Sequence, residues 1–188
     1  MLETRFKWAL LIVMVALLGS AWIVVSRDST LESGPTTLTE APIVGHLAPG
    51  FTLMNAVGQP VALSDFVNRS DGQSRPVVLN FWASWCAPCR IEMPHFQNAS
   101  RKYNGRAAII GVNQAESTEV VSDFGNEFGI SYLLLVDADN TVNRLYNVTG
   151  LPTTIFIDAD GVVREVVVGT VSQAVLEDRI ERLLQSSS

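Results

Sequence analysis

Strand-length apolar runs alternate with helical patterns through most of this sequence, and this alternation limits the folds open to the chain. The strand runs, rich in β-branched and aromatic residues, are 76–82 (PVVLNFW), 107–113 (AAIIGVN), 153–158 (TTIFID) and 162–169 (VVREVVVG). The helical patterns cover 86–103, 117–128 and an amphipathic segment that begins after Ser172. Strands that alternate with helices predict an α/β fold in which a central mixed β-sheet is flanked by helices on both faces.

The N-terminal residues differ from the rest of the chain. Residues 8–25 (WALLIVMVALLGSAWIVV) carry no charge and approach the length of about 20 residues that a helix needs to cross a membrane. Because Arg5 and Lys7 precede this run, the sequence predicts a cytoplasmic segment over 1–7 and one transmembrane helix over 8–25. A cleaved signal peptide with a small-residue site at 19–21 is the alternative. Both interpretations place the following residues outside the cytoplasm.

The predicted organisation after the membrane span is a linker, one domain and a short tail. Residues 26–42 (SRDSTLESGPTTLTEAP) have the polar, Ser-, Thr-, Gly- and Pro-rich composition of a flexible linker. The predicted domain covers 43–185, and 186–188 (SSS) is a frayed tail. The net charge of -6 and the absence of a Lys/Arg cluster argue against a nucleic-acid partner.

Cys86 and Cys89 are the only cysteines in the sequence, and their spacing allows a structural disulfide, part of a metal site or a redox centre. A disulfide across so short a loop stabilises a fold by only about 2 kcal/mol, against about 5 kcal/mol for a hundred-residue loop. A closed zinc site needs four ligands, and only His46 and His95 could join the cysteines. Two thiolates suffice to bind Cu(I), so copper binding stays open.

The segment around the cysteines favours the redox centre. A strand that ends at Trp82, followed by a short turn, would place Cys86 at a helix N-terminus, where unpaired amides and the helix dipole stabilise a thiolate. Pro88 suits the first helical turn, because it lacks only an N–H that would have no partner there. Cys89 would lie one turn deeper, shielded but within bonding distance of Cys86. One sulfur would then attack a disulfide and the other would resolve it.

With these residues, NFWASWCAPC resembles the active-site segment of the thioredoxin fold, and the chain resembles the membrane-anchored, extracytoplasmic thiol-disulfide oxidoreductases of the TlpA/ResA type. The resemblance covers roughly 43–184 and rests on the segments GHLAPGFTL, WCAPCRIEMP, GVNQAES, GLPTTIFID and DADGVV. It implies a thioredoxin-like fold and an enzyme that reduces specific protein disulfides through a CxxC dithiol/disulfide cycle. It implies no metal and no cofactor besides the redox-active disulfide.

The resemblance also assigns roles to individual residues. It makes Cys86 the attacking thiolate and Cys89 the resolving thiol. Pro152 matches a cis-proline packed beside the cysteines, and Leu151 before it would offer its backbone to an extended substrate. Trp85, next to the attacking cysteine, is a candidate for shaping the substrate-binding face.

The expected proton acceptor follows from a departure from ordinary thioredoxin. Asn80 stands where thioredoxin has a buried Asp, and a neutral amide cannot relay a proton. The segment VNQAES (112–117) resembles the ResA-type segment whose glutamate lies near the cysteines. We therefore expect Glu116 to tune the thiol pKa values and to take the proton of Cys89. The alternative is a solvated glutamate, stabilised by the positive end of a helix.

The resemblance also implies partners for the enzyme, and two other functions remain as alternatives. By resemblance, the substrates are protein disulfides, for example the haem-attachment cysteines of apocytochrome c in cytochrome c biogenesis, and the reductant is a membrane thiol transporter of the DsbD/CcdA kind. The pair Ala87-Pro88 has no histidine to stabilise a reduced thiolate, which favours a reductant over an oxidant. One rival is a thiol peroxidase, but Ala83 stands where such enzymes have a threonine. The other is a copper-binding chaperone, for which a wider cysteine spacing is expected.

Overall fold

The computed structural model describes Met14 and residues 39–186, and residues 39–186 belong to one compact unit. The predicted cytoplasmic segment, most of the transmembrane helix and of the linker, and the last two residues of the tail lie outside the described residues, so these remain predictions. In the part of the chain that is described, no helix has both the length and the apolar character needed to cross a membrane. Glu40, at the end of the predicted linker, pairs with Leu47 in an isolated bridge.

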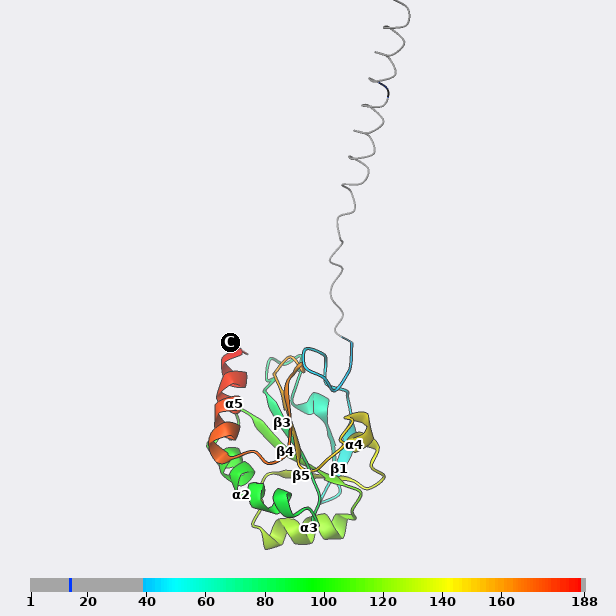
Figure 1. The fold of residues 1–188 in the computed structure, drawn as a ribbon, viewed down its shortest axis with the longest axis vertical. Helices are drawn as coiled ribbons and strands as arrows, with labels where there is room; N and C mark the ends of the chain where they lie inside the picture. Colours follow the sequence, from blue (N-terminus) through cyan, green and yellow to red (C-terminus); the bar gives the residue numbers. More distant parts are fainter. Residues whose placement is uncertain (1–13, 15–38, 187–188) are drawn as a thin grey trace, which may run out of the picture. The chain divides into compact units, whose positions relative to one another are not determined.

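Seven strands form a single sheet in the order β2-β1-β5-β4-β3-β6-β7 (Figure 1). In chain order the strands are β1 Thr52–Asn55, β2 Pro60–Ala62, β3 Val77–Trp82, β4 Ala108–Gln114, β5 Leu133–Asp137, β6 Thr153–Ile157 and β7 Val163–Val168. Strand β3 is parallel to β4 on one side and antiparallel to β6 on the other. The sheet is therefore mixed, as predicted, and β3 is an interior strand that lies between β4 and β6.

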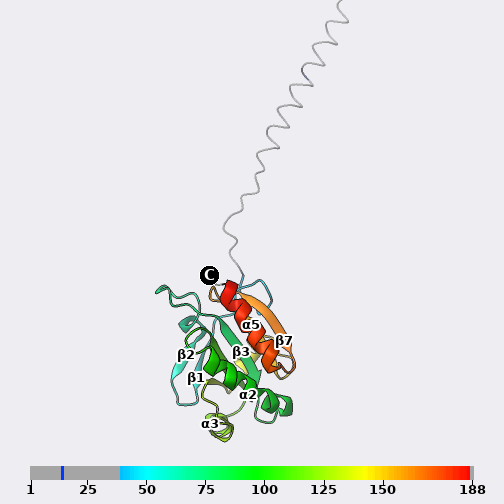
Figure 2. The same cartoon turned by 90° about the vertical axis from the view of Figure 1, so that its left-hand side faces the viewer.

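Helices cover both faces of this sheet. They are the 3-10 helix η1 Leu63–Asp65 and the α-helices α2 Ala87–Lys102, α3 Thr118–Glu127, α4 Thr141–Leu145 and α5 Gln173–Ser186. Side chains from α2, α3 and α5 share one hydrophobic core, whereas α4 and η1 belong to the core on the opposite face. Figure 2 shows α2 and α5, which pack against each other, over the same face. The predicted α/β architecture is confirmed for the described residues.

Strand β3 is buried along its whole length because its two faces enter different cores. Val78 and Trp82 point to the core under α2 and α5, and Leu79 and Phe81 point to the core under α4. A strand buried on both faces has a continuous rather than an alternating apolar sequence, as this one does. Asn80 interrupts that run on the α2 side, which places one polar side chain beneath the helix that carries the cysteines.

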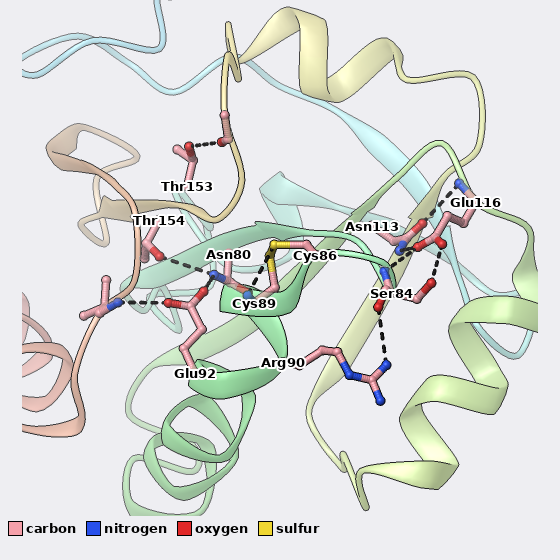
Figure 3. Close-up of a disulfide and its surroundings, with 12 residues drawn as sticks. Asn80, Ser84, Cys86, Cys89, Arg90, Glu92, Asn113, Glu116, Thr153 and Thr154 are labelled. Atoms are coloured by element: carbon pink, nitrogen blue, oxygen red, sulfur yellow. Dashed lines mark hydrogen bonds between the residues drawn. A yellow bond between two sulfur atoms is a disulfide. The ribbon is translucent and has the colours of Figure 1, made fainter.

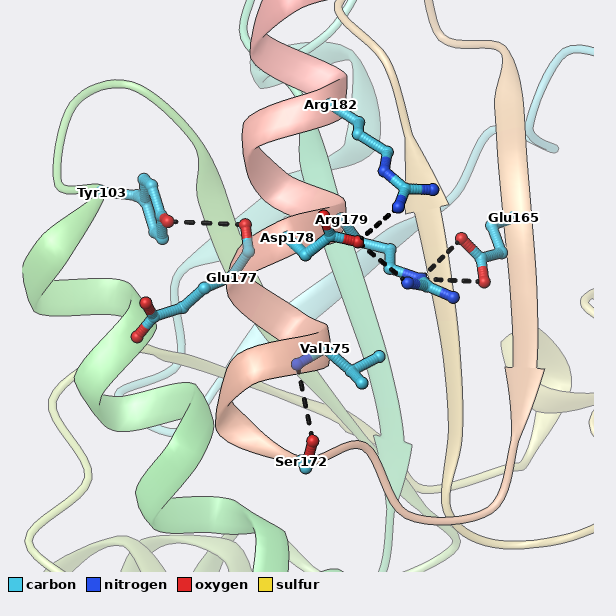
Figure 4. A network of polar contacts seen from close by, with 8 residues as sticks. All are labelled: Tyr103, Glu165, Ser172, Val175, Glu177, Asp178, Arg179 and Arg182. Atoms are coloured by element: carbon cyan, nitrogen blue, oxygen red, sulfur yellow. Dashed lines mark hydrogen bonds and ion pairs between the residues drawn. The ribbon is translucent and has the colours of Figure 1, made fainter.

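Helix α5 is held by polar contacts to two neighbouring elements (Figure 4). Arg179 Nε donates to both carboxylate oxygens of Glu165 on β7, at 3.0 and 2.9 Å. On its other side, the hydroxyl of Tyr103 donates to the carbonyl of Glu177 at 3.5 Å. These contacts hold α5 against β7 and against the C-terminal end of α2.

Gly111 on β4 is a position where the core has no room for a side chain. A Cβ there would lie 2.8 Å from Leu134 Cδ2 and 2.9 Å from Trp82 Nε1. We expect Gly111→Ala to lower the free energy of unfolding by about 1–3 kcal/mol, because neighbouring core side chains must shift. Denaturant unfolding measures this loss. Gly50→Ala is the control, since its Cβ would meet nothing within 4 Å; equal stability of the two variants would contradict the packing described here.

Candidate active site

The Cys86–Cys89 disulfide lies at the N-terminus of α2, directly after the loop that follows β3 (Figure 3). Cys86 is the N-cap of the helix, and its Sγ accepts a hydrogen bond from the backbone N–H of Cys89 at 3.2 Å. Pro88 lies in the first turn, where its missing N–H costs nothing. Cys86 is 4% exposed and Cys89 is fully buried. Cys86 is thus the sulfur nearer to solvent, at a helix end that stabilises a thiolate.

The loop before β6 reaches the same edge of the sheet. The Leu151–Pro152 peptide bond is cis, as the resemblance implied. Phe81 at the end of β3 pairs with Thr153 at the start of β6, so this loop lies beside the segment that leads to the cysteines. The carbonyl of Pro152 accepts a hydrogen bond from Gly169 at 2.8 Å, and within the described part of the chain the backbone of Leu151 makes none. An extended peptide could pair with that backbone.

Glu92 is a completely buried carboxyl on the same helix, three residues after Cys89. Its Oε1 accepts a hydrogen bond from Asn80 Nδ2 at 2.8 Å, and its Oε2 accepts one from the backbone N–H of Val171 at 2.9 Å (Figure 3). Burial raises the pKa of Glu92 to about 7, and these two hydrogen bonds oppose the rise only in part. A buried carboxyl that titrates near neutral pH, one helical turn from a cysteine, is suited to proton transfer.

Asn80 supplies a neutral donor to this carboxyl. It is fully buried on β3, opposite Thr154 on β6, and its Nδ2 also lies 3.3 Å from Thr154 Oγ1. Its Oδ1 has no hydrogen-bond partner among the described residues. The ionisable group beneath the cysteines is therefore carried by the active-site helix, and the strand contributes an uncharged amide.

Glu116 lies on the other side of the disulfide from Glu92 in Figure 3. Its carboxylate accepts hydrogen bonds from Ser84, in the turn before Cys86, and from Asn113 at the end of β4. Among the described residues, no hydrogen bond joins Glu116 to either cysteine. Its predicted role as proton acceptor is not tested by these contacts.

Trp85 lies on the surface, whereas the two histidines contact backbone carbonyls. Trp85, beside Cys86, is 68% exposed. His46 Nδ1 lies 3.3 Å from the carbonyl of Thr39, and His95 Nδ1 lies 3.0 Å from the carbonyl of Val171. Across the residues that the structure describes, no three His, Cys, Asp or Glu side chains are grouped as a metal site requires.

Glu92 is the residue that the sequence analysis missed, although a signal for it was present. Cys89, Met93 and Phe96 recur at helical spacing and form the buried stripe of α2. Glu92 falls within that stripe, because residues three apart on a helix share a face. An acidic residue inside an otherwise apolar stripe identifies a candidate buried carboxyl.

Comparisons with known proteins agree with this geometry. The model of the AhpC/TSA family matches residues 44–166. The thioredoxin-like protein YneN of Bacillus subtilis is 32% identical over 179 residues, which cover 93% of this chain and 97% of YneN. The thiol-disulfide oxidoreductase ResA of Geobacillus kaustophilus is 32% identical over 178 residues, 94% of each chain. A thioredoxin-family thiol:disulfide interchange protein from Chlorobium tepidum superposes with a TM-score of 0.64 and 26% identity, over 78% of this chain and 99% of its own.

These matches extend well beyond the CxxC motif. The family model spans the cysteines, the cis-proline loop and all of the sheet except the end of β7. The two relatives are similar over nearly their whole lengths. Because sheet, loop and cysteine segment are matched together, the chain belongs to the AhpC/TSA family and is a thioredoxin-like thiol-disulfide oxidoreductase.

Proposed function

We propose that this enzyme reduces selected protein disulfides outside the cytoplasmic membrane. The observation that carries the proposal is the Cys86–Cys89 disulfide at the start of α2, in which the first sulfur lies nearer to solvent, the second is fully buried and a buried carboxyl lies one turn deeper. Thiol-disulfide exchange needs an accessible attacking thiolate, a shielded resolving thiol and a group that accepts the resolving proton.

In the reductive direction, the Cys86 thiolate attacks one sulfur of a substrate disulfide. The substrate S–S bond breaks, a mixed disulfide forms and the first substrate sulfur leaves as a thiolate. Cys89, having passed its proton to Glu92, then attacks Cys86 Sγ. The second substrate sulfur leaves, and the Cys86–Cys89 disulfide forms again. Two electrons have passed from the dithiol to the substrate, and the two substrate thiolates take up protons.

We assign the proton of Cys89 to Glu92 in preference to Glu116. Glu92 is buried on the helix face that carries Cys89 and titrates near neutral pH. Glu116 lies beyond the turn before Cys86, where Ser84 and Asn113 bind its carboxylate, and it is not on the helix face of Cys89. In this proposal, the two glutamates on either side of the disulfide have different roles.

Substrate contacts are assigned to the surface around Cys86. Leu151 offers its backbone to an extended segment of the substrate, and Pro152 holds that loop beside the disulfide. Trp85 contributes an exposed indole, a large apolar surface of the kind that protein partners cover.

The proposed setting follows from the sequence. The uncharged run 8–25 anchors the chain, with 1–7 in the cytoplasm and the domain, predicted over 43–185, outside. There the proposed substrates include the haem-attachment cysteines of apocytochrome c, and a membrane thiol reductant of the DsbD/CcdA kind restores the dithiol. Similarity to ResA supports the exchange chemistry.

Equilibration of the full chain with glutathione buffers tests the direction of the reaction. We expect a reduction potential closer to about -270 mV than to about -120 mV, together with catalysed reduction of insulin disulfides, because no histidine between the cysteines stabilises a reduced thiolate. A value near -120 mV would make the enzyme an oxidant. Tight stoichiometric Cu(I) binding without reductase activity would favour a copper chaperone, and peroxide turnover would favour a thiol peroxidase.

A further inference from the structure

Ser84 occupies the turn that leads into the attacking cysteine. Ser84 and Trp85 are the central residues of this turn, which is closed by a hydrogen bond from the N–H of Cys86 to the carbonyl of Ala83 at 3.1 Å. The conformation of Ser84 therefore sets the direction of the indole and the position of the N-cap sulfur.

All three polar groups of Ser84 are bound by charged side chains (Figure 3). Its N–H donates to Glu116 Oε2 at 2.7 Å, and its hydroxyl donates to Glu116 Oε1 at 2.5 Å. Its carbonyl accepts a hydrogen bond from Arg90 Nη1 at 3.3 Å. We call Ser84, Glu116 and Arg90 the Ser84 clasp. Hydrogen bonds to charged partners are about twice as strong as neutral ones, so the clasp restrains the turn strongly.

Glu116 is itself oriented by the end of β4. Asn113 Nδ2 donates to Glu116 Oε2 at 2.7 Å, and Asn113 Oδ1 accepts from the N–H of Glu116 at 3.2 Å. Between them, Ala115 adopts a left-handed conformation with a φ of 57°. For a residue other than glycine this costs about 1–2 kcal/mol. The segment that places the Glu116 carboxylate at Ser84 therefore contains a strained backbone conformation at Ala115.

Arg90, on the other side of the turn, also contacts α3 and the residue that follows it. Its guanidinium pairs with Glu127 on α3 at 3.0 Å and lies 4.5 Å from the ring centroid of Phe128. The clasp therefore joins the turn to α2, to the end of β4 and to α3.

We propose that Glu116 is a positioning residue, which acts through Ser84 to hold Trp85 and Cys86 in the geometry needed for attack on a protein disulfide. The inference rests on the proposed function and gives Glu116 a role other than proton transfer. Displacement of a reacting group by about 1 Å can slow a reaction about 100-fold. Loss of the clasp should therefore slow the attack by Cys86.

Two substitutions of Glu116 separate positioning from proton transfer. In Glu116→Gln, the amide oxygen accepts from Ser84 N–H and Asn113, and the amide nitrogen donates to the Ser84 hydroxyl, which serves equally as an acceptor. In Glu116→Ala, all of these contacts are lost. We expect the Ala variant to attack insulin disulfides about 10- to 100-fold more slowly than wild type, and the Gln variant to recover most of that rate.

The measurement is the second-order rate of insulin reduction by the reduced full chain, with the thiolate absorbance of Cys86 followed against pH and the free energy of unfolding determined in parallel. Ser84→Ala provides a second variant: it should slow attack by itself and add little to Glu116→Ala, because both remove the same contact. Asp123→Ala, which removes an exposed carboxylate from the middle of α3, should match wild type.

Three results would overturn the inference. The first is a Glu116→Gln variant as slow as Glu116→Ala, which would indicate that the charge of Glu116 or proton transfer is needed. The second is a Glu116→Ala variant that attacks insulin as fast as wild type. The third is full additivity of the rate effects of Ser84→Ala and Glu116→Ala. Failure of the proposed function can be distinguished from these results, because the wild-type protein would then not reduce insulin at all.

Discussion

Replacing Cys86 with Ser is expected to abolish disulfide exchange, whereas replacing Cys89 with Ser is expected to stop the reaction halfway. Without Cys86, the remaining sulfur is fully buried and cannot reach a substrate disulfide. Without Cys89, the sulfur of Cys86, which lies nearer to solvent, still attacks, but nothing releases the mixed disulfide. Insulin reduction should fall to the uncatalysed rate in both variants. Mass spectrometry should find a covalent adduct only with Cys89→Ser, and in native membranes that adduct identifies the substrate.

The two variants control for each other. Each removes the same short disulfide loop, so each should lose a similar stability, about 2 kcal/mol relative to the oxidised wild type. A difference in adduct formation therefore reports the positions of Cys86 and Cys89. Adducts that form with Cys86→Ser and not with Cys89→Ser would show that the attacking and resolving roles are reversed.

Glu92→Gln is expected to slow release of the mixed disulfide about 100-fold and to remove the pH dependence of that step near pH 7. The carboxyl with a pKa of about 7 accepts the proton of Cys89 only once it is ionised, so the wild-type rate should rise as the pH passes 7. A glutamine keeps the size and the contact with Val171 but takes up no proton. Stopped-flow kinetics of the resolving step across pH 5–9 measures the effect.

Glu92→Gln should lower the rate of the resolving step but raise the free energy of unfolding at alkaline pH. The pKa of Glu92 is raised from 4.5 in the unfolded chain to about 7, so the wild-type protein is most stable below about pH 4.5 with respect to this group and loses stability as the pH rises through 7. The loss is on the order of 3 kcal/mol. Glu92→Gln lacks it and should be the more stable protein at pH 8, although the less active one.

The control for both measurements is Asp123→Asn, which changes an exposed carboxylate in the middle of α3 and should leave rate and stability as in wild type. If Glu92→Gln kept the wild-type pH profile, Glu92 would not be the proton acceptor. If Glu116→Gln lost the pH dependence of the resolving step, the proton acceptor would be Glu116, the residue expected from the sequence.

Strands and helices with strong periodicity could be predicted from the sequence, and short or partly exposed strands could not. The predictions for β3, β4, the β6–β7 hairpin, α2, α3 and α5 agree with the structure to within one or two residues. Strand β5, LLLVD, was missed because a short apolar run gives no period that separates strand from helix. Strand β2 lies at the sheet edge and β1 lies next to it, and the partial exposure of both strands removes the apolar signal.

The residues of the active site likewise fall into those that could be predicted from the sequence and those that could not. Cys86, Cys89 and the cis bond before Pro152 were predicted because they belong to local motifs. The place of Glu92 in the apolar stripe of α2 is a local signal of burial. Its hydrogen bond from Val171 joins segments far apart in the sequence, and no local pattern encodes such a contact.

The interior place of β3 has a consequence for the folded site. The cysteine pair is a local feature of the chain, but Asn80 meets Thr154 only when β6 has paired with β3, and a shift of one residue would turn Asn80 to the opposite face. The same pairing brings the cis-proline loop beside the cysteines. A chain in which β6 had not paired with β3 would carry the dithiol without its substrate loop, so selectivity for substrates depends on a contact between distant segments, whereas the reactive pair itself does not.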